Sequence, residues 1–268
     1  MPDELTIQGM MTYLSRDISK IIFIHETLES TNITAAELAR TGAEHGTVII
    51  ANHQTGGKGR FGRAFYSPPD YGLYMSLILH PAKIGLSIPS LITAYAAVAV
   101  CEAIENISTK SPQIKWVNDI FLDDKKICGI LTESVKTSSY NGFRHVVVGI
   151  GVNFSTPDLD FPIELRQSAG ALFDSDSLSK QHSVTRNRLA AEIINRIVFS
   201  ENCRNQEQML EKYRQRIFLL GKKVTVTEIE GSSFEGTAID VDDIGRLIVK
   251  RANGELVPLF AGEVSVKF

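Results

Sequence analysis

The sequence predicts an α+β fold, in which a mixed sheet backed by helices is followed by a small all-β module. Strand-like and helix-like runs alternate through the first 220 residues of the 268-residue chain. The pattern changes at Gly221, after which five short strand-like runs follow one another between glycine- and aspartate-containing turns. Such spacing is typical of small barrels. We therefore expect two domains, residues 1–220 and residues 221–268.

Composition indicates a globular protein of the cytoplasm. The chain is 43% hydrophobic, and its net charge of −3 argues against bulk nucleic-acid binding. Its longest apolar stretch, Ile92–Val100, is too short to span a membrane, and the N-terminus lacks a signal pattern. Cys101, Cys128 and Cys203 lie far apart and form no CxxC, which fits a reducing compartment. The histidines show no zinc-binding spacing, so we expect no metal ligands among the side chains.

The first 20 residues form a short extension that could hold one helix, near residues 10–20. An apolar strand is expected at Ile21–Ile24, followed by a helix at Ala35–Arg40. Ser30, Thr31 or Asn32 could cap this helix, which is the ordinary role of such residues. Their hydroxyl and amide groups could equally face a ligand.

The remaining elements are predicted from apolar periodicity and turn residues. A long alanine-rich helix is expected over residues 87–107, and two amphipathic helices over 185–199 and 207–219. Residues 155–183 are rich in Ser, Asp and Pro, so we expect a mobile loop there. Strands are expected over residues 47–52, 72–79, 114–122, 127–131, 145–153, 223–229, 233–241, 246–250, 256–259 and 263–268.

A glycine-rich basic loop, Gln54–Arg63, is the most distinctive stretch of the chain. Between Gly56 and Arg63 it holds four glycines and three cations. Backbone N–H groups of glycines can approach an anion closely, and Lys and Arg add full charge. The loop therefore predicts a site for a phosphate or another anionic ligand, although a solvated basic loop is the alternative.

Two familiar phosphate-binding motifs do not explain this loop. Three of its glycines match GxGxxG, but that fingerprint needs a helix directly afterwards and an acidic residue about 20 positions on. Pro68-Pro69 blocks a long helix, and no acid lies near that offset. A P-loop would need Ser or Thr after Lys58, where this chain has Gly59.

A second polar cluster is Lys115-Trp116-Val117-Asn118-Asp119, followed by Lys126 and Gly129. In a continuous strand, Lys115, Val117 and Asp119 would share one face. Taken alone, this alternation is ordinary for an exposed edge strand, and Lys126 would be an ordinary hairpin residue.

Taken together, these segments resemble the biotin protein ligase family. The resemblance covers roughly residues 22–268 and rests on six elements in the family's order and spacing. They are Ser30-Thr31-Asn32, Gln54 with Gly57–Arg63, Lys115–Asp119, Lys126–Leu131, Gly149-x-Gly151-x-Asn153, and Gly262–Ser265. The chain departs from the family pattern at Val117, which replaces the usual proline, and at Lys58, which replaces the first loop arginine. Phe65 stands where many relatives have tryptophan.

The resemblance implies a catalytic core like that of class II aminoacyl-tRNA synthetases and biotin–lipoate ligases, followed by an SH3-like barrel. It implies that residues 1–220 bind biotin and ATP and form biotinyl-5′-AMP with release of pyrophosphate. A lysine of a biotin carboxyl carrier domain would then accept the biotin. Mg²⁺ would accompany ATP, and the family often forms homodimers.

By resemblance, three overlapping groups of residues form the site. Catalysis is assigned to Lys126, Arg60 and Asp119, where Asp119 either takes a proton from the acceptor lysine or anchors Lys126. The biotin group is Ser30, Thr31, Asn32, Gln54, Gly57, Arg60, Lys126 and Gly129. The adenylate group is Lys58, Arg60, Arg63, Phe65, Asn118, Lys126 and Asn153. Glu263 and Lys267 are weaker candidates in the barrel. The glycine loop is expected to order over the bound adenylate and exclude water.

Three other functions are less consistent with the sequence. A lipoate or octanoyl ligase would carry an RRxSGGGxVxHD run, which is absent. A DNA-binding repressor would need a helix-turn-helix domain, and the 20 residues before the core are too few for one. An inactive binding module would have no need of Lys126, Arg60 and Asp119. We therefore expect an active ligase that binds no DNA.

Overall fold

The computed structural model describes residues 3–136, 143–174, 184–199, 205–228, 231–260 and 262–266. Cys203 and Lys267 lie outside these residues, and only the backbone of Glu263 is described. The helices are α1 (Ile7–Met11), α2 (Thr31–Arg40), α3 (Pro81–Ile84), α4 (Pro89–Ile107), α6 (Arg186–Ile194) and α7 (Gln206–Arg216). Shorter helical turns are η1 (Ser19–Ile21), η2 (Arg60–Gly62), η3 (Asp158–Asp160) and η4 (Asn195–Phe199).

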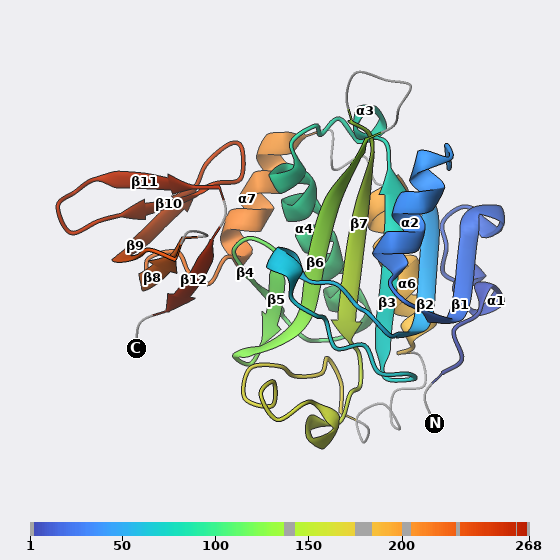
Figure 1. The fold of residues 1–268 in the computed structure, drawn as a ribbon. Helices are drawn as coiled ribbons and strands as arrows, with labels where there is room; N and C mark the ends of the chain where they lie inside the picture. The colour runs from blue at the N-terminus through green and yellow to red at the C-terminus, as the bar shows by residue number, and fades with distance from the viewer. Residues whose placement is uncertain are drawn as a thin grey trace.

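Two sheets organise the chain (Figure 1). The strands are β1 (Ile22–Leu28), β2 (Thr47–Gln54), β3 (Gly72–Leu79), β4 (Gln113–Lys115), β5 (Asp119–Leu122), β6 (Lys125–Lys136), β7 (Phe143–Asn153), β8 (Lys223–Thr227), β9 (Ser233–Val241), β10 (Leu247–Lys250), β11 (Leu256–Leu259) and β12 (Glu263–Val266). The larger sheet has seven strands in the order β1-β2-β3-β7-β6-β5-β4. Its β1–β2 pair is parallel and its other pairs are antiparallel, so the predicted mixed sheet and α+β class are confirmed.

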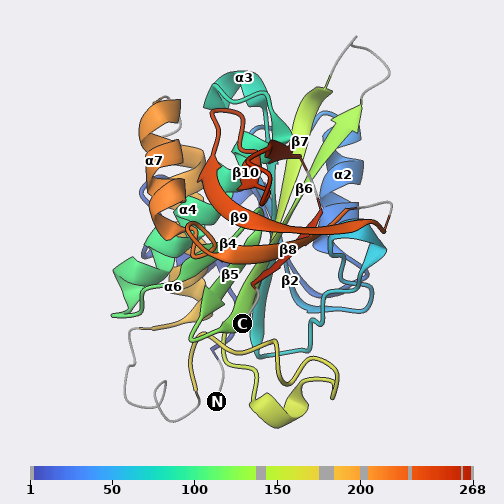
Figure 2. The ribbon, with the colours of Figure 1, turned by 90° about the vertical axis from the view of Figure 1, so that its left-hand side faces the viewer.

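Helices cover both faces of the large sheet because its central strands are apolar on both sides (Figures 1 and 2). Successive side chains of a strand point to opposite faces. In β2, Val48 and Ile50 accordingly join the main core, whereas Ile49 packs in a second cluster with Ala35 and Ala39 of α2. This leaves α2 on one face and α4, α6 and α7 on the other (Figure 2).

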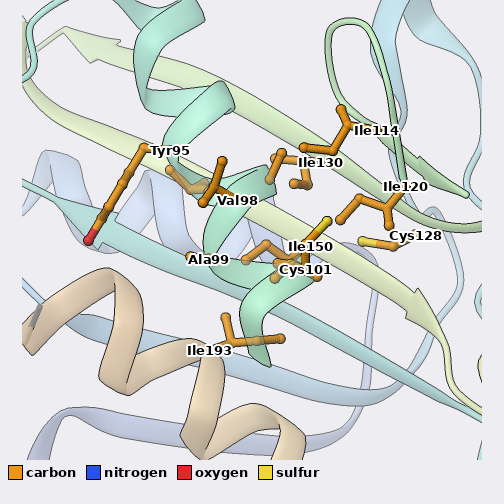
Figure 3. Packing of buried hydrophobic residues seen from close by; sticks show 14 of the residues in the cluster. Tyr95, Val98, Ala99, Cys101, Ile114, Ile120, Cys128, Ile130, Ile150 and Ile193 are labelled. Carbon is orange, nitrogen blue, oxygen red and sulfur yellow. The ribbon is translucent and has the colours of Figure 1, made fainter. Parts of the chain in front are cut away.

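The central helix of the main core is α4. By length and composition it is the one helix in the described parts of the chain that could cross a membrane. In the fold it is mostly buried, and Figure 3 shows its side chains packed toward Ile130 and Ile150 of the sheet and Ile193 of α6. Packing in a globular core therefore accounts for its apolar sequence.

Two helix predictions near the N-terminus need correction. The helix expected over residues 10–20 is wrong, because α1 ends at Met11 and starts after Thr6, whose hydroxyl accepts a hydrogen bond from Gly9 N at 3.0 Å. The next helix, α2, begins at Thr31, before the predicted Ala35. Ser30 occupies its N-cap position, but the Ser30 side chain makes no capping bond. The Ser30 hydroxyl therefore does not cap the N-terminus of α2.

The second polar cluster is not a continuous strand. β4 ends at Lys115, β5 begins at Asp119, and these two residues pair across a hairpin. Trp116, Val117 and Asn118 form its turn, and the Trp116–Val117 peptide bond is cis. The prediction that Lys115, Val117 and Asp119 alternate along one strand is therefore wrong. Lys115 and Asp119 are cross-strand neighbours, which brings their side chains together.

The segment after β7 is a loop, as predicted, and its described part is anchored to β6. Lys126 N donates to Ser168 O at 2.8 Å, and Gly170 N donates to Lys126 O at 3.0 Å. Phe161 of the same loop is buried. These backbone bonds place residues 155–174 against one end of the large sheet.

The strands predicted after residue 221 are confirmed where the structure describes them, whereas residues 229, 267 and 268 of the predicted strands lie outside the described residues. The strands pair as an antiparallel sheet in the order β11-β10-β9-β8-β12. Among the described residues, β11 and β12 are the edge strands of this sheet, and no pairing between them closes it into a barrel. This small sheet lies beside β4 and β5 (Figures 1 and 2). Two side chains of the larger unit donate to its β9–β10 turn, Trp116 Nε1 to Gly245 O at 3.0 Å and Ser90 Oγ to Ile244 O at 2.7 Å.

Candidate active site

A cavity of about 440 Å³ opens between the large sheet, the glycine-rich loop, the loop after β7 and the small sheet. Its floor is the face of β6 and β7 on which Gly129, Gly149 and Gly151 lie. Gly129 and Gly151 are direct cross-strand partners. Because neither residue has a side chain, the sheet surface is hollowed at this point.

The aromatic ring of Phe65 fills that hollow. A Cβ atom on Gly151 would lie 2.5 Å from a ring carbon of Phe65, and one on Gly129 would lie 3.2 Å from another. Phe65 is held by its backbone, since Phe65 N donates to Gly57 O at 2.8 Å. Gly57 is itself packed against Phe65 O and Ser67, with no room for a side chain. The glycine-rich loop thus folds back to carry an aromatic ring onto the sheet.

One end of the cavity is uncharged and rich in hydrogen-bonding groups. Gln54 Oε1 accepts from Thr31 N at 2.8 Å, and Gln54 Nε2 donates to Ser67 Oγ at 2.9 Å. These two bonds fix the orientation of the amide. Ser30, Thr31 and Asn32 at the start of α2 complete this end and are all buried. We call these four cavity residues, Ser30, Thr31, Asn32 and Gln54, the amide end.

The other end is cationic. Lys126 Nζ lies 2.8 Å from Asp119 Oδ1. The contact is ionic and not an aligned hydrogen bond, because Asp119 Oδ1 has no hydrogen-bond partner within the described residues. Arg60 Nη1 donates to Asn118 Oδ1 at 3.0 Å, and Asn118 Nδ2 donates to Ile130 O at 2.9 Å. Asn118 thereby ties the arginine of the loop to β6.

Lys115 adds a third cation to this end. Burial lowers the pKa of Lys115, an effect that Asp119 opposes and that Lys126 and Arg63 reinforce. Burial likewise lowers the pKa of Arg60, again opposed by Asp119. In the described residues no carboxylate forms an ion pair with Lys115. One carboxylate thus faces several partly desolvated cations, so this end has an excess of positive charge that suits an anionic ligand.

Comparison with known proteins identifies the family of this chain. Residues 24–153 match the model of the biotin/lipoate A/B protein ligase family, and residues 219–267 match that of the biotin protein ligase C terminal domain. The bifunctional ligase/repressor BirA of Bacillus subtilis is 34% identical over 240 residues, which cover 87% of this chain and 70% of that protein. The chain belongs to the biotin protein ligase family.

Other family members agree in sequence or in fold. The biotin–[acetyl-CoA-carboxylase] ligase of Mycobacterium tuberculosis is 29% identical, with 88% of this chain and 85% of that protein covered. A biotin protein ligase of Aquifex aeolicus, solved in complex with biotin and ATP, superposes with a TM-score of 0.74 at 24% identity over 92% of this chain and 99% of that chain. At this identity the superposition shows that the fold is shared.

The structure brings the predicted site residues of this ligase-family chain together. All members of the catalytic, biotin and adenylate groups except Gly57 line this cavity, and Gly57 lies beneath it as the support of Phe65. The weaker candidates Glu263 and Lys267 are not tested, because their side chains lie outside the described residues. Asn153 lines the cavity while donating Nδ2 to Gly170 O at 3.1 Å, so it also anchors the loop after β7.

Sequence reasoning missed the part of the cavity wall that is formed by Phe161 and Leu165 of the loop after β7 and by Thr227 of the small sheet. Lys115 and Ser265 also line the cavity; both were parts of recognised motifs but received no role. The alternation of apolar residues at positions 161, 163 and 165 within a polar loop was the available signal for the missed loop contacts.

Proposed function

We propose that this protein is an ATP-dependent biotin protein ligase, which forms biotinyl-5′-AMP and transfers biotin to a lysine of a biotin carboxyl carrier domain. The observation that carries the proposal is a single cavity with the amide end on one side and several cations on the other. Gln54 on β2 and Lys126 on β6 are three strand spacings apart, or about 14 Å. A neutral ureido head and a polyanionic triphosphate can therefore occupy the two ends together.

The first reaction joins two anions, so it depends on the cationic end. A carboxylate oxygen of biotin attacks the α-phosphorus of ATP, the bond from that phosphorus to the bridging oxygen breaks, and pyrophosphate leaves. Lys126, positioned by Asp119, neutralises both the carboxylate and the α-phosphate. Arg60 contacts the phosphates from the loop side, and Lys58, Arg63 and Lys115 contribute charge around them. The ring of Phe65 lies along the adenylate.

Magnesium would enter this site with the nucleotide. The described residues contain no cluster of three or more metal-ligating side chains. Asp119, the carboxylate at the cationic end, would hold such an ion together with the phosphate oxygens of ATP. The ion would supply charge neutralisation for the departing pyrophosphate.

The second reaction transfers biotin to the carrier lysine, whose amine displaces AMP after losing a proton. Asp119 lies beside Lys126 and is the nearest group that could orient or deprotonate that amine. The glycine-rich loop closes over the adenylate during this step and limits its hydrolysis. We further propose that the chain acts in the cytoplasm and that residues 1–220 and 221–268 are separate domains.

Biotin-dependent exchange of labelled pyrophosphate into ATP tests the first reaction. Lys126→Ala is expected to lower the exchange rate about 100-fold or more, because it removes a cation from the charge-developing atoms. Lys125→Ala is the matched control, since its neighbouring ammonium pairs with the exposed carboxylate of Asp158 at 3.2 Å. Undiminished exchange by Lys126→Ala would refute the mechanism. Lipoate in place of biotin should support no exchange.

Asp119→Asn separates the two roles of Asp119. If the carboxylate only positions Lys126, exchange and transfer to a carrier domain should fall together. If it serves as the base for the carrier lysine, exchange should survive while transfer from preformed biotinyl-5′-AMP falls about 100-fold. Single-turnover measurements of the two steps provide this comparison.

A further inference from the structure

A buried hydroxyl in the apolar strand β3 joins the amide end to a carboxylate on β6. Ser76 is fully buried, and its Oγ lies 2.6 Å from Asn32 Oδ1 and 2.8 Å from Thr31 Oγ1. Asn32 Nδ2 in turn donates to Glu133 Oε2 at 2.7 Å. These residues form a chain of hydrogen bonds from β6 through α2 and β3 to the cavity.

The carboxylate of Glu133 fixes the direction of the first link. An ionised carboxylate can only accept hydrogen bonds. Asn32 must therefore turn its NH₂ group toward Glu133, and the same group lies 3.4 Å from the carbonyl oxygen of Leu131, also an acceptor. The amide is held in place by packing, because a Cβ atom on Gly149 would lie 2.0 Å from Asn32 Oδ1. The carbonyl oxygen of Asn32 consequently faces Ser76.

The hydroxyl group of Ser76 has one hydrogen, and the bond to Asn32 uses it. The carbonyl oxygen of Asn32 cannot donate, so Ser76 donates to it. The remaining contact, between Ser76 and Thr31, can be a hydrogen bond only if Thr31 is the donor. The other polar neighbour of the Thr31 hydroxyl is Gln54 Oε1, 3.2 Å away, which is also an acceptor because it receives Thr31 N. Whether Thr31 donates to Ser76 Oγ or to Gln54 Oε1, its hydroxyl hydrogen points into the protein.

We propose that Glu133, Asn32 and Ser76 are positioning residues that fix Thr31 as a hydrogen-bond acceptor toward the cavity, so that this end of the site selects a substrate with a ring N–H. The inference rests on the proposed function, in which the ureido ring of biotin occupies the amide end. An isosteric ring oxygen at that position would place two acceptors against each other. A site built for a donor rejects an analogue that lacks it far more strongly than it rejects a change of size.

The test compares biotin with two analogues in which one or the other ureido N–H is replaced by oxygen. The measured quantity is the ratio of kcat/KM for biotin to that for each analogue in pyrophosphate exchange. Wild type should prefer biotin by about 1,000-fold over at least one analogue. Glu133→Gln keeps the shape of the side chain but allows the chain of hydrogen bonds to reverse. It should lower that ratio at least tenfold, while KM for ATP stays within about twofold of wild type.

Ser76→Ala removes the middle link and should lower the same ratio at least tenfold. Thr93→Val is the matched control, because Thr93 is a buried hydroxyl 2.8 Å from Thr132 Oγ1 and is outside the cavity lining. It should leave the ratio unchanged. Glu133→Gln is nearly isosteric, so it decides the matter if Ser76→Ala does not fold.

The outcomes separate this inference from the proposed function. If wild type discriminates between biotin and the analogue but Glu133→Gln and Ser76→Ala keep the full kcat/KM ratio, the positioning role of Glu133, Asn32 and Ser76 is overturned. An equal loss of the ratio in Thr93→Val would overturn it as well. Absence of any biotin-dependent exchange by wild type would instead overturn the proposed function.

Discussion

At the scale of single residues, the floor of the cavity is defined by side chains that are missing. Gly129 and Gly151 face each other across β6 and β7, and the ring of Phe65 occupies the space that their side chains would need. The loop that carries Phe65 is held by Gly57, which has no room for a Cβ atom. Three glycines far apart in sequence therefore place one aromatic ring.

Gly151→Ala should displace the Phe65 ring, because its Cβ atom would lie 2.5 Å from a ring carbon. We expect KM for ATP in pyrophosphate exchange to rise about tenfold, since a contact surface of the adenylate moves. A double-mutant cycle with Phe65→Ala checks the cause. If the ring transmits the effect, Gly151→Ala should add little in the Phe65→Ala background, whereas full additivity would contradict this account.

At the scale of elements, strands bounded by turn residues were predictable. The bounds of β3, β9 and β11 match their predictions because Gly, Asp, Asn or Pro residues flank each strand. The hairpin of β4 and β5 was missed because Trp116 and Val117 have high strand propensity, although here they form a turn. The start of α2 was missed because Thr31 and Asn32 are weak helix formers, and bonds to Gln54, Ser76 and Glu133 hold them in place.

The residues of the candidate site were likewise predictable only where a local motif contains them. Local motifs revealed the residues of the glycine-rich loop and of the β6 and β7 strands. The loop after β7 was expected to be mobile because of its Ser, Asp and Pro content, yet backbone bonds to Lys126 anchor its described part, residues 155–174. Those bonds join segments about 40 residues apart, and local composition carries no information on such pairing.

The end of the sheet opposite the cavity carries a pH-dependent contact. His45 Nδ1 accepts a hydrogen bond from His80 N at 3.1 Å, so the ring of His45 is neutral in the folded state. Burial, with help from Lys83 and His80, lowers the pKa of His45 to about 4. The His145 ring also packs on His80, with 4.3 Å between centroids. A proton on the His45 ring would therefore be unfavourable.

Stability should fall as the pH drops from about 6.5 toward 4. Over that window the unfolded chain binds a proton at His45 that the folded chain does not, so the slope is at most about 1.4 kcal/mol per pH unit and less after allowance for partial exposure. His45→Asn keeps an acceptor near His80 N and removes the titration. The urea midpoint should then decrease less between pH 7.5 and 5.0 than in wild type. An equal decrease would assign the effect to other groups.

At the scale of the whole molecule, the β9–β10 turn joins the two sheets. Asp242 organises this turn, since its Oδ1 accepts from Ile244 N at 3.2 Å and Arg246 N at 2.9 Å. Burial opposes ionisation, but the bonds from Arg246 and Ile244 hold the pKa of Asp242 below its ordinary value. The carbonyl of Gly245 in this turn accepts the indole N–H of Trp116. The small sheet is thereby held where its residues can line the cavity.

Asp242→Ala should uncouple the small sheet from the large one. Trp116 is the only tryptophan of the chain and is buried, so its fluorescence reports on this contact. In wild type, urea transitions followed by fluorescence and by far-ultraviolet circular dichroism should coincide. In Asp242→Ala, the fluorescence transition should come at lower urea, because the turn loses the acceptor for two amides, at a cost of about 1–3 kcal/mol. Asn253→Ala is the control, since Asn253 Oδ1 accepts from Glu255 N at 3.0 Å in the exposed β10–β11 turn. Its two transitions should stay together; a separation as large as that of Asp242→Ala would show that any weakened turn in the small sheet suffices.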